Sequence, residues 1–147
     1  VPDDVNALTS NAGWDTLKHK DFLTEVIKEF KNNGIRTSIF VDPILKQIEG
    51  AKATGTDRIE LYTEAFAKQY ALGDYNSVKP YADCAVLATR LGMGVNAGHD
   101  LSLSNIAFFS EKVPGLLEVS IGHALVSESL YLGVENVIQM YLRKLKH

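Results

Sequence analysis

Short apolar runs alternate with helical patterns along the whole chain, and this alternation limits the possible folds more than any other feature of the sequence. Runs rich in β-branched and apolar residues predict strands at Thr37–Val41, Arg58–Tyr62, Met93–Asn96 and Leu117–Ile121. Strands that alternate with helices in this way are parallel and are joined by helical crossovers. The sequence therefore predicts an α/β fold with a parallel sheet.

Apolar residues at helical spacing lie before, between and after these strands. They predict helices around Phe22–Phe30, from Asp42 and Pro43, over Ser77–Leu91, from about Leu103 and from about Val134. Asp42 is expected to cap the second of these helices, because its side chain can accept hydrogen bonds from free backbone N–H groups. Pro43 suits the first helical position, where no N–H is needed.

Two of the strands carry polar residues on one face. In Leu117–Ile121 the three apolar residues are expected to share one face, with Glu118 and Ser120 on the other. In Arg58–Tyr62, Glu60 lies opposite two apolar neighbours. Strands of an open doubly wound sheet are usually apolar on both faces, so a polar second face favours the lumen of a barrel.

A complete (β/α)8 barrel needs eight strands and about 250 residues. The chain has 147 residues and supplies about half of the required strands, so it is expected to be a portion of a TIM barrel. No low-complexity linker or break in composition divides it, and a single domain over residues 1–147 is expected.

A Gly-His pair follows two successive predicted strands, as Gly98-His99 and as Gly122-His123. Each pair falls at the carboxyl end of its strand, where α/β barrels place their active sites. Glycine lets the backbone approach a ligand, the helix that follows attracts phosphate, and histidine exchanges protons near neutral pH. The alternative is that both histidines cap helices or fill space.

Glu60 is a second candidate, because a carboxylate in the middle of a strand is costly to bury without a partner. Its proton affinity is tuned for chemistry, or it forms an ion pair with a basic residue in the lumen. Glu118 lies deeper in its strand, and a structural partner is expected there. The single cysteine, Cys84, lies in an apolar helical pattern and is expected to be a buried, reduced thiol.

Several classes of function lack support in the sequence. The formal net charge is −3 and no basic run is present, which argues against nucleic-acid binding. No apolar stretch approaches the roughly 20 residues that cross a bilayer, and a cytoplasmic location is expected. No cluster of metal ligands and no glycine-rich nucleotide loop is recognisable, so neither a structural zinc nor a nucleotide cofactor is expected.

Several motifs together resemble the pyridoxine 5′-phosphate synthase family: Val95–His99 (VNAGH), Ile121–Ala124 (IGHA), Ser38–Asp42 (SIFVD), Ile59–Thr63 (IELYT) and Val1–Asp3 (VPD). The resemblance implies the C-terminal portion of a (β/α)8 TIM barrel with extra helices, roughly three-fifths of such an enzyme. It also implies condensation of 1-deoxy-D-xylulose 5-phosphate with 3-amino-2-oxopropyl phosphate. The products are pyridoxine 5′-phosphate, phosphate and water, and no cofactor takes part.

By this resemblance, His99 is a proton donor and Glu60 stabilises a charged transition state. The substrates, both small phosphorylated molecules, are bound by Thr9, Asp100, Gly122 and His123. Thr9 contacts the deoxyxylulose phosphate, and the other three residues bind the aminooxopropyl phosphate. One position departs from the family, which usually has glycine where this chain has Asp100. The backbone N–H of Asp100 is therefore expected to contact phosphate, with the carboxylate pointing away.

Two alternatives remain open. One is another phosphosugar-handling barrel enzyme, although the predicted strands contain no lysine for a Schiff base and no clustered metal ligands. The other is a non-catalytic half-barrel fragment that binds a partner through its open edge. The resemblance implies that further acid–base residues belong to an N-terminal part that this chain lacks. It also implies a homo-oligomer, for which the last helix, from Val134 onward, could supply an interface.

Overall fold

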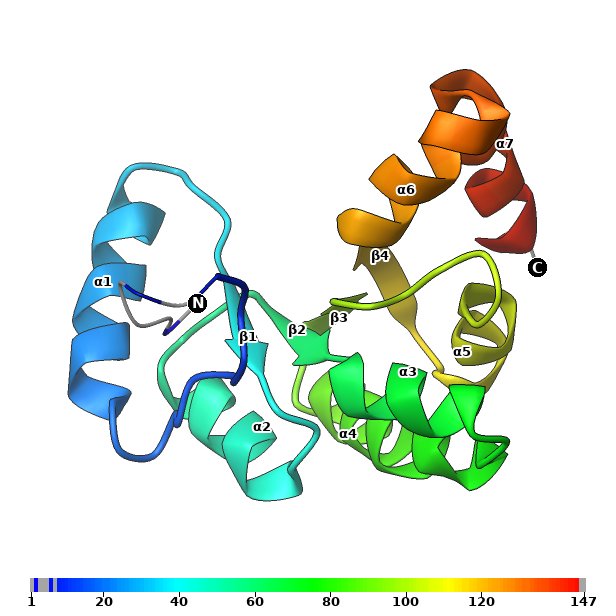
Figure 1. Cartoon of the computed structure of the whole chain (residues 1–147). Coiled ribbons are helices and arrows are strands. Elements are labelled where there is room, and N and C mark those ends of the chain that lie inside the picture. Colours follow the sequence, from blue (N-terminus) through cyan, green and yellow to red (C-terminus); the bar gives the residue numbers. More distant parts are fainter. Residues whose placement is uncertain (1, 3–5, 7, 146–147) are drawn as a thin grey trace.

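The computed structural model describes residues 2, 6 and 8–145 of the chain. Its sheet has four strands, all parallel and adjacent in chain order (Figure 1). They are β1 (Ser38–Val41), β2 (Arg58–Tyr62), β3 (Gly94–Gly98) and β4 (Leu116–Ser120). The predicted parallel α/β arrangement is confirmed.

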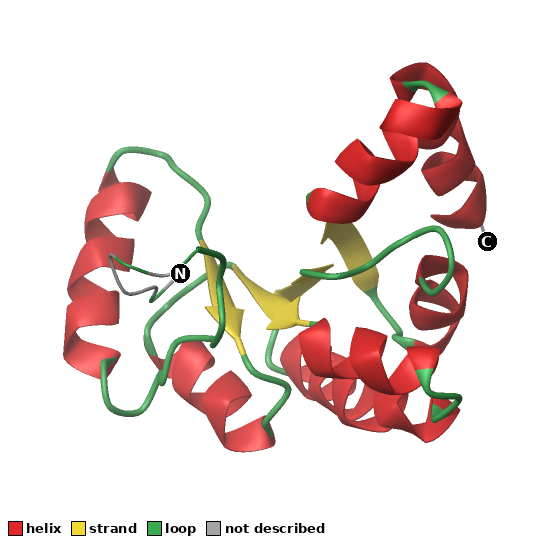
Figure 2. Ribbon diagram, viewed as in Figure 1, coloured by secondary structure: helices red, strands yellow, loops and turns green. Residues whose placement is uncertain are grey.

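Helices precede and follow the strands and lie along one side of the curved sheet (Figure 2). They are α1 (Lys20–Asn32), α2 (Leu45–Ala53), α3 (Glu64–Ala71), the 3-10 helix η1 (Tyr75–Val78), α4 (Lys79–Arg90), α5 (Ile106–Lys112), α6 (His123–Leu132) and α7 (Val134–Leu145). The apolar spacing did not predict α3. Both α3 and α6 are additional to the one helix per strand that a simple barrel requires. No helix within the described part of the chain is both long and apolar enough to cross a membrane.

The hydrophobic core lies between the sheet and these helices. Ile59 and Leu61 of β2 are fully buried, and so are Val95 and Ala97 of the neighbouring β3. Cys84 of α4 belongs to the same cluster and is a free, buried thiol, as predicted. Full burial of an aliphatic side chain contributes about 1.5–3 kcal/mol, so this layer fixes which face of the sheet meets the helices.

A β-bulge in β4 changes the predicted alternation. The pairing with β3 passes from Leu116 directly to Glu118 and leaves Leu117 as an extra residue. The side chain of Leu117 is 58% exposed, and a Cβ added at Gly94 would come within 2.9 Å of its Cδ1 and of Arg58. The expectation that all three apolar residues of this strand share the helix-covered face is therefore wrong for Leu117, because an inserted residue shifts the two-residue period.

The predicted start of the second helix is also wrong. The helix begins at Leu45, and the residue before it, Ile44, is extended at φ −123° and ψ 121°. The N–H of Ile44 donates to the carbonyl oxygen of Asp42 at 2.7 Å, so the chain makes a turn through Pro43 before the helix starts. Asp42 and Pro43 belong to this turn, and no side chain caps the helix.

Charged residues meet on the polar face of the sheet near the amino ends of the strands. Arg58 Nη1 lies 2.8 Å from a Glu118 carboxylate oxygen, and Arg36 Nη2 lies 3.2 Å from the same oxygen. Asn96 bridges the pair, since its side chain accepts from Arg58 at 3.1 Å and donates to Glu118 at 3.2 Å. The structural partner expected for Glu118 is confirmed.

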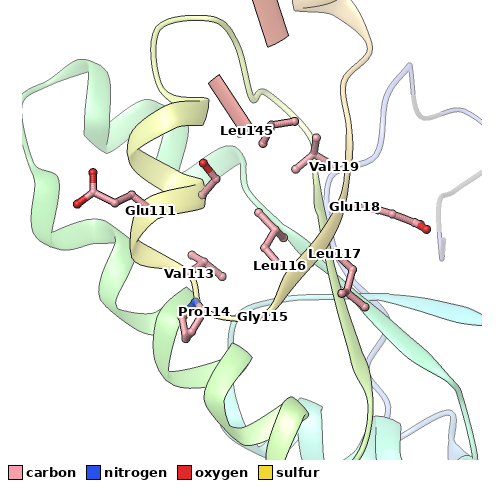
Figure 3. A pocket seen from close by; sticks show the side chains of 10 residues that line it. Glu111, Val113, Pro114, Gly115, Leu116, Leu117, Glu118, Val119 and Leu145 are labelled. Atoms are coloured by element: carbon pink, nitrogen blue, oxygen red, sulfur yellow. The ribbon is translucent and has the colours of Figure 1, made fainter. Parts of the chain in front are cut away.

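The two outer edges of the sheet differ. The N–H of Trp14 donates to the carbonyl oxygen of Phe40 at 2.7 Å, so the segment before α1 meets the outer edge of β1. No described strand pairs with the outer edge of β4. Beside that edge lies an open pocket of about 350 Å³ between β4, α5 and the end of α7. Figure 3 shows Val119 and Leu145 next to each other there, with Glu118 pointing away.

Candidate functional site

A second pocket lies at the carboxyl ends of the strands. Its volume is about 370 Å³, and it is lined by Thr9, Ser10, Phe40, Glu60, His99, Asp100, Ser120, Ile121, Gly122 and His123. All six candidate residues from the sequence are in this set. Five of them come from β2 or from the turns after β3 and β4, because the carboxyl ends of parallel strands meet at one rim of the sheet. Thr9 reaches the same rim from the segment before α1. None of them lines the pocket beside β4.

His99 follows β3 directly and occupies the middle of this rim. Its Nε2 lies 3.1 Å from the Thr9 hydroxyl oxygen, so the structure joins two residues that are ninety positions apart. The Tyr62 ring packs edge-on against the imidazole, with ring centroids 4.9 Å apart. The His99 side chain is only 15% exposed. The imidazole is therefore held on two sides while one edge borders the pocket.

The backbone at the end of β3 is in an unusual conformation. His99 has φ 86° and Asp100 has φ 57°, both in the left-handed region that residues with a side chain rarely adopt. Such a conformation costs about 1–3 kcal/mol and persists where the surroundings fix it. It turns the chain sharply at the rim, where both side chains reach the pocket.

Thr63, directly after β2, holds this turn. Its N–H donates to the carbonyl oxygen of Gly98 at 3.0 Å, and its hydroxyl donates to the same oxygen at 2.8 Å. The hydroxyl also contacts the carbonyl oxygen of His99. Thr63 is completely buried. Sequence reasoning missed its positioning role, and the one available signal was its place in the family motif that ends β2.

Glu60 reaches the pocket from β2. A Cβ added at Gly98 would lie 2.3 Å from a Glu60 carboxylate oxygen, so the glycine leaves room for this side chain. Burial raises the pKa of the Glu60 carboxyl above its ordinary value of 4.5, and a hydrogen bond from Ser120 offsets part of that rise. No Lys, Arg or His side chain in the described part of the chain forms an ion pair with Glu60.

Gly122 and His123 begin α6, with Gly122 at the N-cap and His123 as the first helical residue. His123 is exposed at the pocket rim. The first backbone N–H groups of a helix have no partner within the helix, and the positive end of the helix dipole lies there. An anionic group of a ligand fits this position.

No group of three or more His, Cys, Asp or Glu residues among those that the structure describes could hold a metal ion. The pocket contains the imidazole of His99, the carboxyl of Glu60 with its raised pKa, and the backbone N–H groups at the start of α6, which can bind an anion. This set suits acid–base chemistry on a phosphorylated molecule.

Comparison with known proteins identifies the family. The model for "Pyridoxal phosphate biosynthesis protein PdxJ" matches residues 1–147. The chain belongs to the PdxJ family. Similar curated proteins are named pyridoxine 5′-phosphate synthase. One, from Flavobacterium johnsoniae, is 68% identical over 146 residues, and another, from Christiangramia forsetii, is 67% identical over the same length. The protein of that name from Cytophaga hutchinsonii is 54% identical.

The chain spans about three-fifths of the length of these PdxJ relatives. The matches cover 99% of this chain but 62% of the Flavobacterium and Christiangramia proteins and 61% of the Cytophaga protein. PdxJ proteins are TIM barrels, and the four parallel strands form part of such a barrel. The predicted fold, the C-terminal portion of a TIM barrel with parallel strands and extra helices, is confirmed.

Of the family motif VPD, Val1 and Asp3 lie outside the described residues.

Proposed function

We propose that the complete protein is a pyridoxine 5′-phosphate synthase. It condenses 1-deoxy-D-xylulose 5-phosphate with 3-amino-2-oxopropyl phosphate to pyridoxine 5′-phosphate, phosphate and water, as a transferase of vitamin B6 biosynthesis. The observation that carries the proposal is the single pocket into which Glu60, His99, His123 and the other three candidate residues converge. The proposal includes a cytoplasmic homo-oligomer that uses no cofactor and binds neither nucleic acid nor membrane.

His99 is the proposed proton donor. Formation of the aromatic ring requires the loss of water, and hydroxide is a poor leaving group. As the carbon–oxygen bond breaks, its electron pair leaves with the oxygen, and Nε2 of the imidazolium supplies the proton that completes the water molecule. Thr9, 3.1 Å from Nε2, sits where it can also contact the substrate. Glu60 borders the same pocket, and its carboxylate form stabilises positive charge that develops on the condensing substrates.

Phosphate binding is assigned to the two turns that follow β3 and β4. The donors are the backbone N–H groups at Asp100 and His123 together with the His123 imidazole, and both residues line the pocket rim. A backbone donor carries no side-chain charge, so the carboxylate of Asp100 is compatible with this role provided that it turns away from the phosphate. The remaining acid–base groups of the reaction belong to the part of the barrel that this chain does not include.

Substitution of the two histidines tests the proposal. In the complete protein, His99→Asn should lower turnover at least about 100-fold, because asparagine keeps a polar group but removes the titrating site. The effect of this substitution on the KM for deoxyxylulose phosphate should be much smaller. His123→Asn should mainly raise the KM for aminooxopropyl phosphate. Steady-state kinetics of both variants against both substrates measure these effects.

Two results would contradict this assignment. Near-normal turnover in His99→Asn together with complete loss in His123→Asn would reverse the proposed roles. Failure of the wild-type complete protein to form pyridoxine 5′-phosphate from the two substrates would exclude the proposed reaction. Turnover of a different phosphosugar would then favour another barrel enzyme.

A further inference from the structure

The two nitrogens of the His99 imidazole have different surroundings. Nε2 contacts the Thr9 hydroxyl at 3.1 Å. Nδ1 is buried and forms no hydrogen bond with any residue that the structure describes. The nearest charged group is the carboxylate of Asp100, whose Oδ2 lies 3.4 Å from Nδ1. This separation is slightly longer than a good hydrogen bond, and catalytic hydrogen bonds are often longer before the substrate binds.

The backbone explains how two consecutive residues can face each other. Both His99 and Asp100 have positive φ angles, which fold the Asp100 side chain back beside the ring. Aspartate and asparagine tolerate this left-handed conformation better than most residues. The His99 side chain is 15% exposed and that of Asp100 is 38% exposed, so water screens the pair only partly.

We propose that Asp100 is a positioning residue whose carboxylate accepts a hydrogen bond from Nδ1 of His99. This contact fixes the ring with Nδ1 protonated and Nε2 toward Thr9 and the pocket. A proton donor must deliver its proton from a fixed direction, so the orientation of the ring and the choice of the protonated nitrogen decide whether Nε2 can serve.

Other titratable groups also face the His99 imidazole. Glu60 approaches from β2 and His123 from α6, both across the pocket. Glu64 of α3 lies within electrostatic range of His99, but its carboxylate is already bonded to Lys68 and to the Tyr62 hydroxyl. Asp100 is the one carboxylate of the described residues within ion-pair distance of the ring. Its removal should therefore disturb the orientation of the His99 ring more than removal of the others.

Asp100→Asn tests the orientation without reference to turnover. Asparagine keeps the left-handed backbone and the backbone N–H but removes the charge. In the complete protein, the ring ¹⁵N signals of His99, assigned by their absence in His99→Asn, should report protonation at Nδ1 in the wild type and loss of that preference in Asp100→Asn. Asp83→Asn, which removes the same charge from the exposed, Lys79-paired carboxylate on α4, should leave these signals unchanged. Unchanged His99 signals in Asp100→Asn would overturn the inference.

The catalytic consequence rests on the proposed function and has its own readout. In the complete protein, Asp100→Asn should lower kcat about 10-fold, because a misplaced donor transfers its proton less well, and should leave the KM for deoxyxylulose phosphate nearly unchanged. In a His99→Asn background, Asp100→Asn should cause no further loss of kcat, because Asp100 acts through His99. An additive loss would overturn the inference. Loss of the preference for protonated Nδ1 in Asp100→Asn, in a complete protein that forms no pyridoxine phosphate, would support the inference and reject the proposed function.

Discussion

Gly98 shows how a single residue shapes the pocket. Because Gly98 has no side chain, the Glu60 carboxylate fills the space beside it. A Cβ added at Gly98 would lie 2.3 Å from a Glu60 carboxylate oxygen and 3.0 Å from the Ser120 Cβ. The end of a flexible side chain moves more easily than a strand. Gly98→Ala should therefore displace Glu60 and lower turnover of the complete protein about 10- to 100-fold, since small misplacements of a catalytic group have effects of this size.

Gly94→Ala is the matched control for this substitution. Gly94 lies on the same face of β3 but at its opposite end, and an added Cβ would meet Arg58 and Leu117 at 2.9 Å. Overpacking at either glycine should cost about 1–3 kcal/mol of stability. Urea unfolding should show similar losses for both variants, whereas kinetic assays should show a large loss for Gly98→Ala alone. Equal losses of activity would mean that Gly98 has no special relation to Glu60.

Glu60 also makes a prediction for the pH dependence of stability. Burial raises the pKa of its carboxyl above 4.5, so in the window between 4.5 and that raised value the folded state holds more protons than the unfolded state. The free energy of unfolding therefore falls as pH rises through this window and stays lower above it. Glu60→Gln removes this dependence, and its stability relative to wild type should increase with pH.

Urea unfolding of the complete protein and of Glu60→Gln, between about pH 4 and about pH 8, measures this difference. Glu49→Gln, on an exposed position of α2, is a control that should show no comparable trend. A stability difference that shrinks as pH rises would show that the folded protein stabilises the charged carboxylate instead. If Glu60 also acts in catalysis, Glu60→Gln should be less active than the wild type even at the pH where it is relatively more stable.

At the scale of elements, β2 and β3 are joined beyond their last paired residues by Thr63. Its hydroxyl bonds to the carbonyl oxygen of Gly98 and contacts that of His99 within a fully buried environment. Thr63→Val keeps the shape of the side chain but leaves these carbonyl groups without the hydroxyl. It should lower the free energy of unfolding of the complete protein by about 1–3 kcal/mol.

Thr63→Ser keeps the hydroxyl and is the matched control. It should restore the orientation of His99 and most of the turnover that Thr63→Val loses, at the cost of one buried methyl group, about 1 kcal/mol. Chemical denaturation and steady-state kinetics of the two variants separate stability from orientation. Equal turnover in the two variants would show that the backbone N–H of Thr63 is sufficient to hold the end of β3.

At the scale of the whole molecule, the open edge of β4 concerns the rest of the barrel. Within the described residues the sheet has four strands, and no strand covers the outer edge of β4. A TIM barrel closes with eight strands, so in the complete protein a strand from the remaining part should pair there. The backbone amides of β4 that point away from β3 should then exchange slowly with deuterium in the complete protein.

The same amides should exchange rapidly in the 147-residue chain expressed alone, because an unpaired edge leaves them open to water. Hydrogen exchange read by NMR compares the two proteins, and the amides between β2 and β3 serve as the internal reference. Equally rapid exchange of the β4 amides in both proteins would show that the remaining part does not close the barrel at this edge.

The residue patterns by themselves predicted the parallel α/β fold and pointed to Glu60 and to the two Gly-His pairs at the carboxyl ends of strands. The two-residue period of β2 and the repeated Gly-His pair are local patterns, and parallel topology then brings the carboxyl ends of strands together. The polar second face of two strands favoured a barrel, and the family motifs added the proposed reaction together with Thr9 and Asp100 as site residues. Cys84 and Glu118 were also predicted correctly, because burial and charge pairing follow from residue type and position.

The tertiary structure alone decided the details that depend on contacts between distant segments. The bulge at Leu117 follows from pairing with β3, and the turn before α2 replaced the predicted cap at Asp42. The hydrogen bond of Thr63 to the end of β3 requires a neighbouring strand. The approach of Asp100 to His99 requires particular backbone angles. Local propensity cannot specify such contacts, because their energy arises only when segments far apart in the sequence meet.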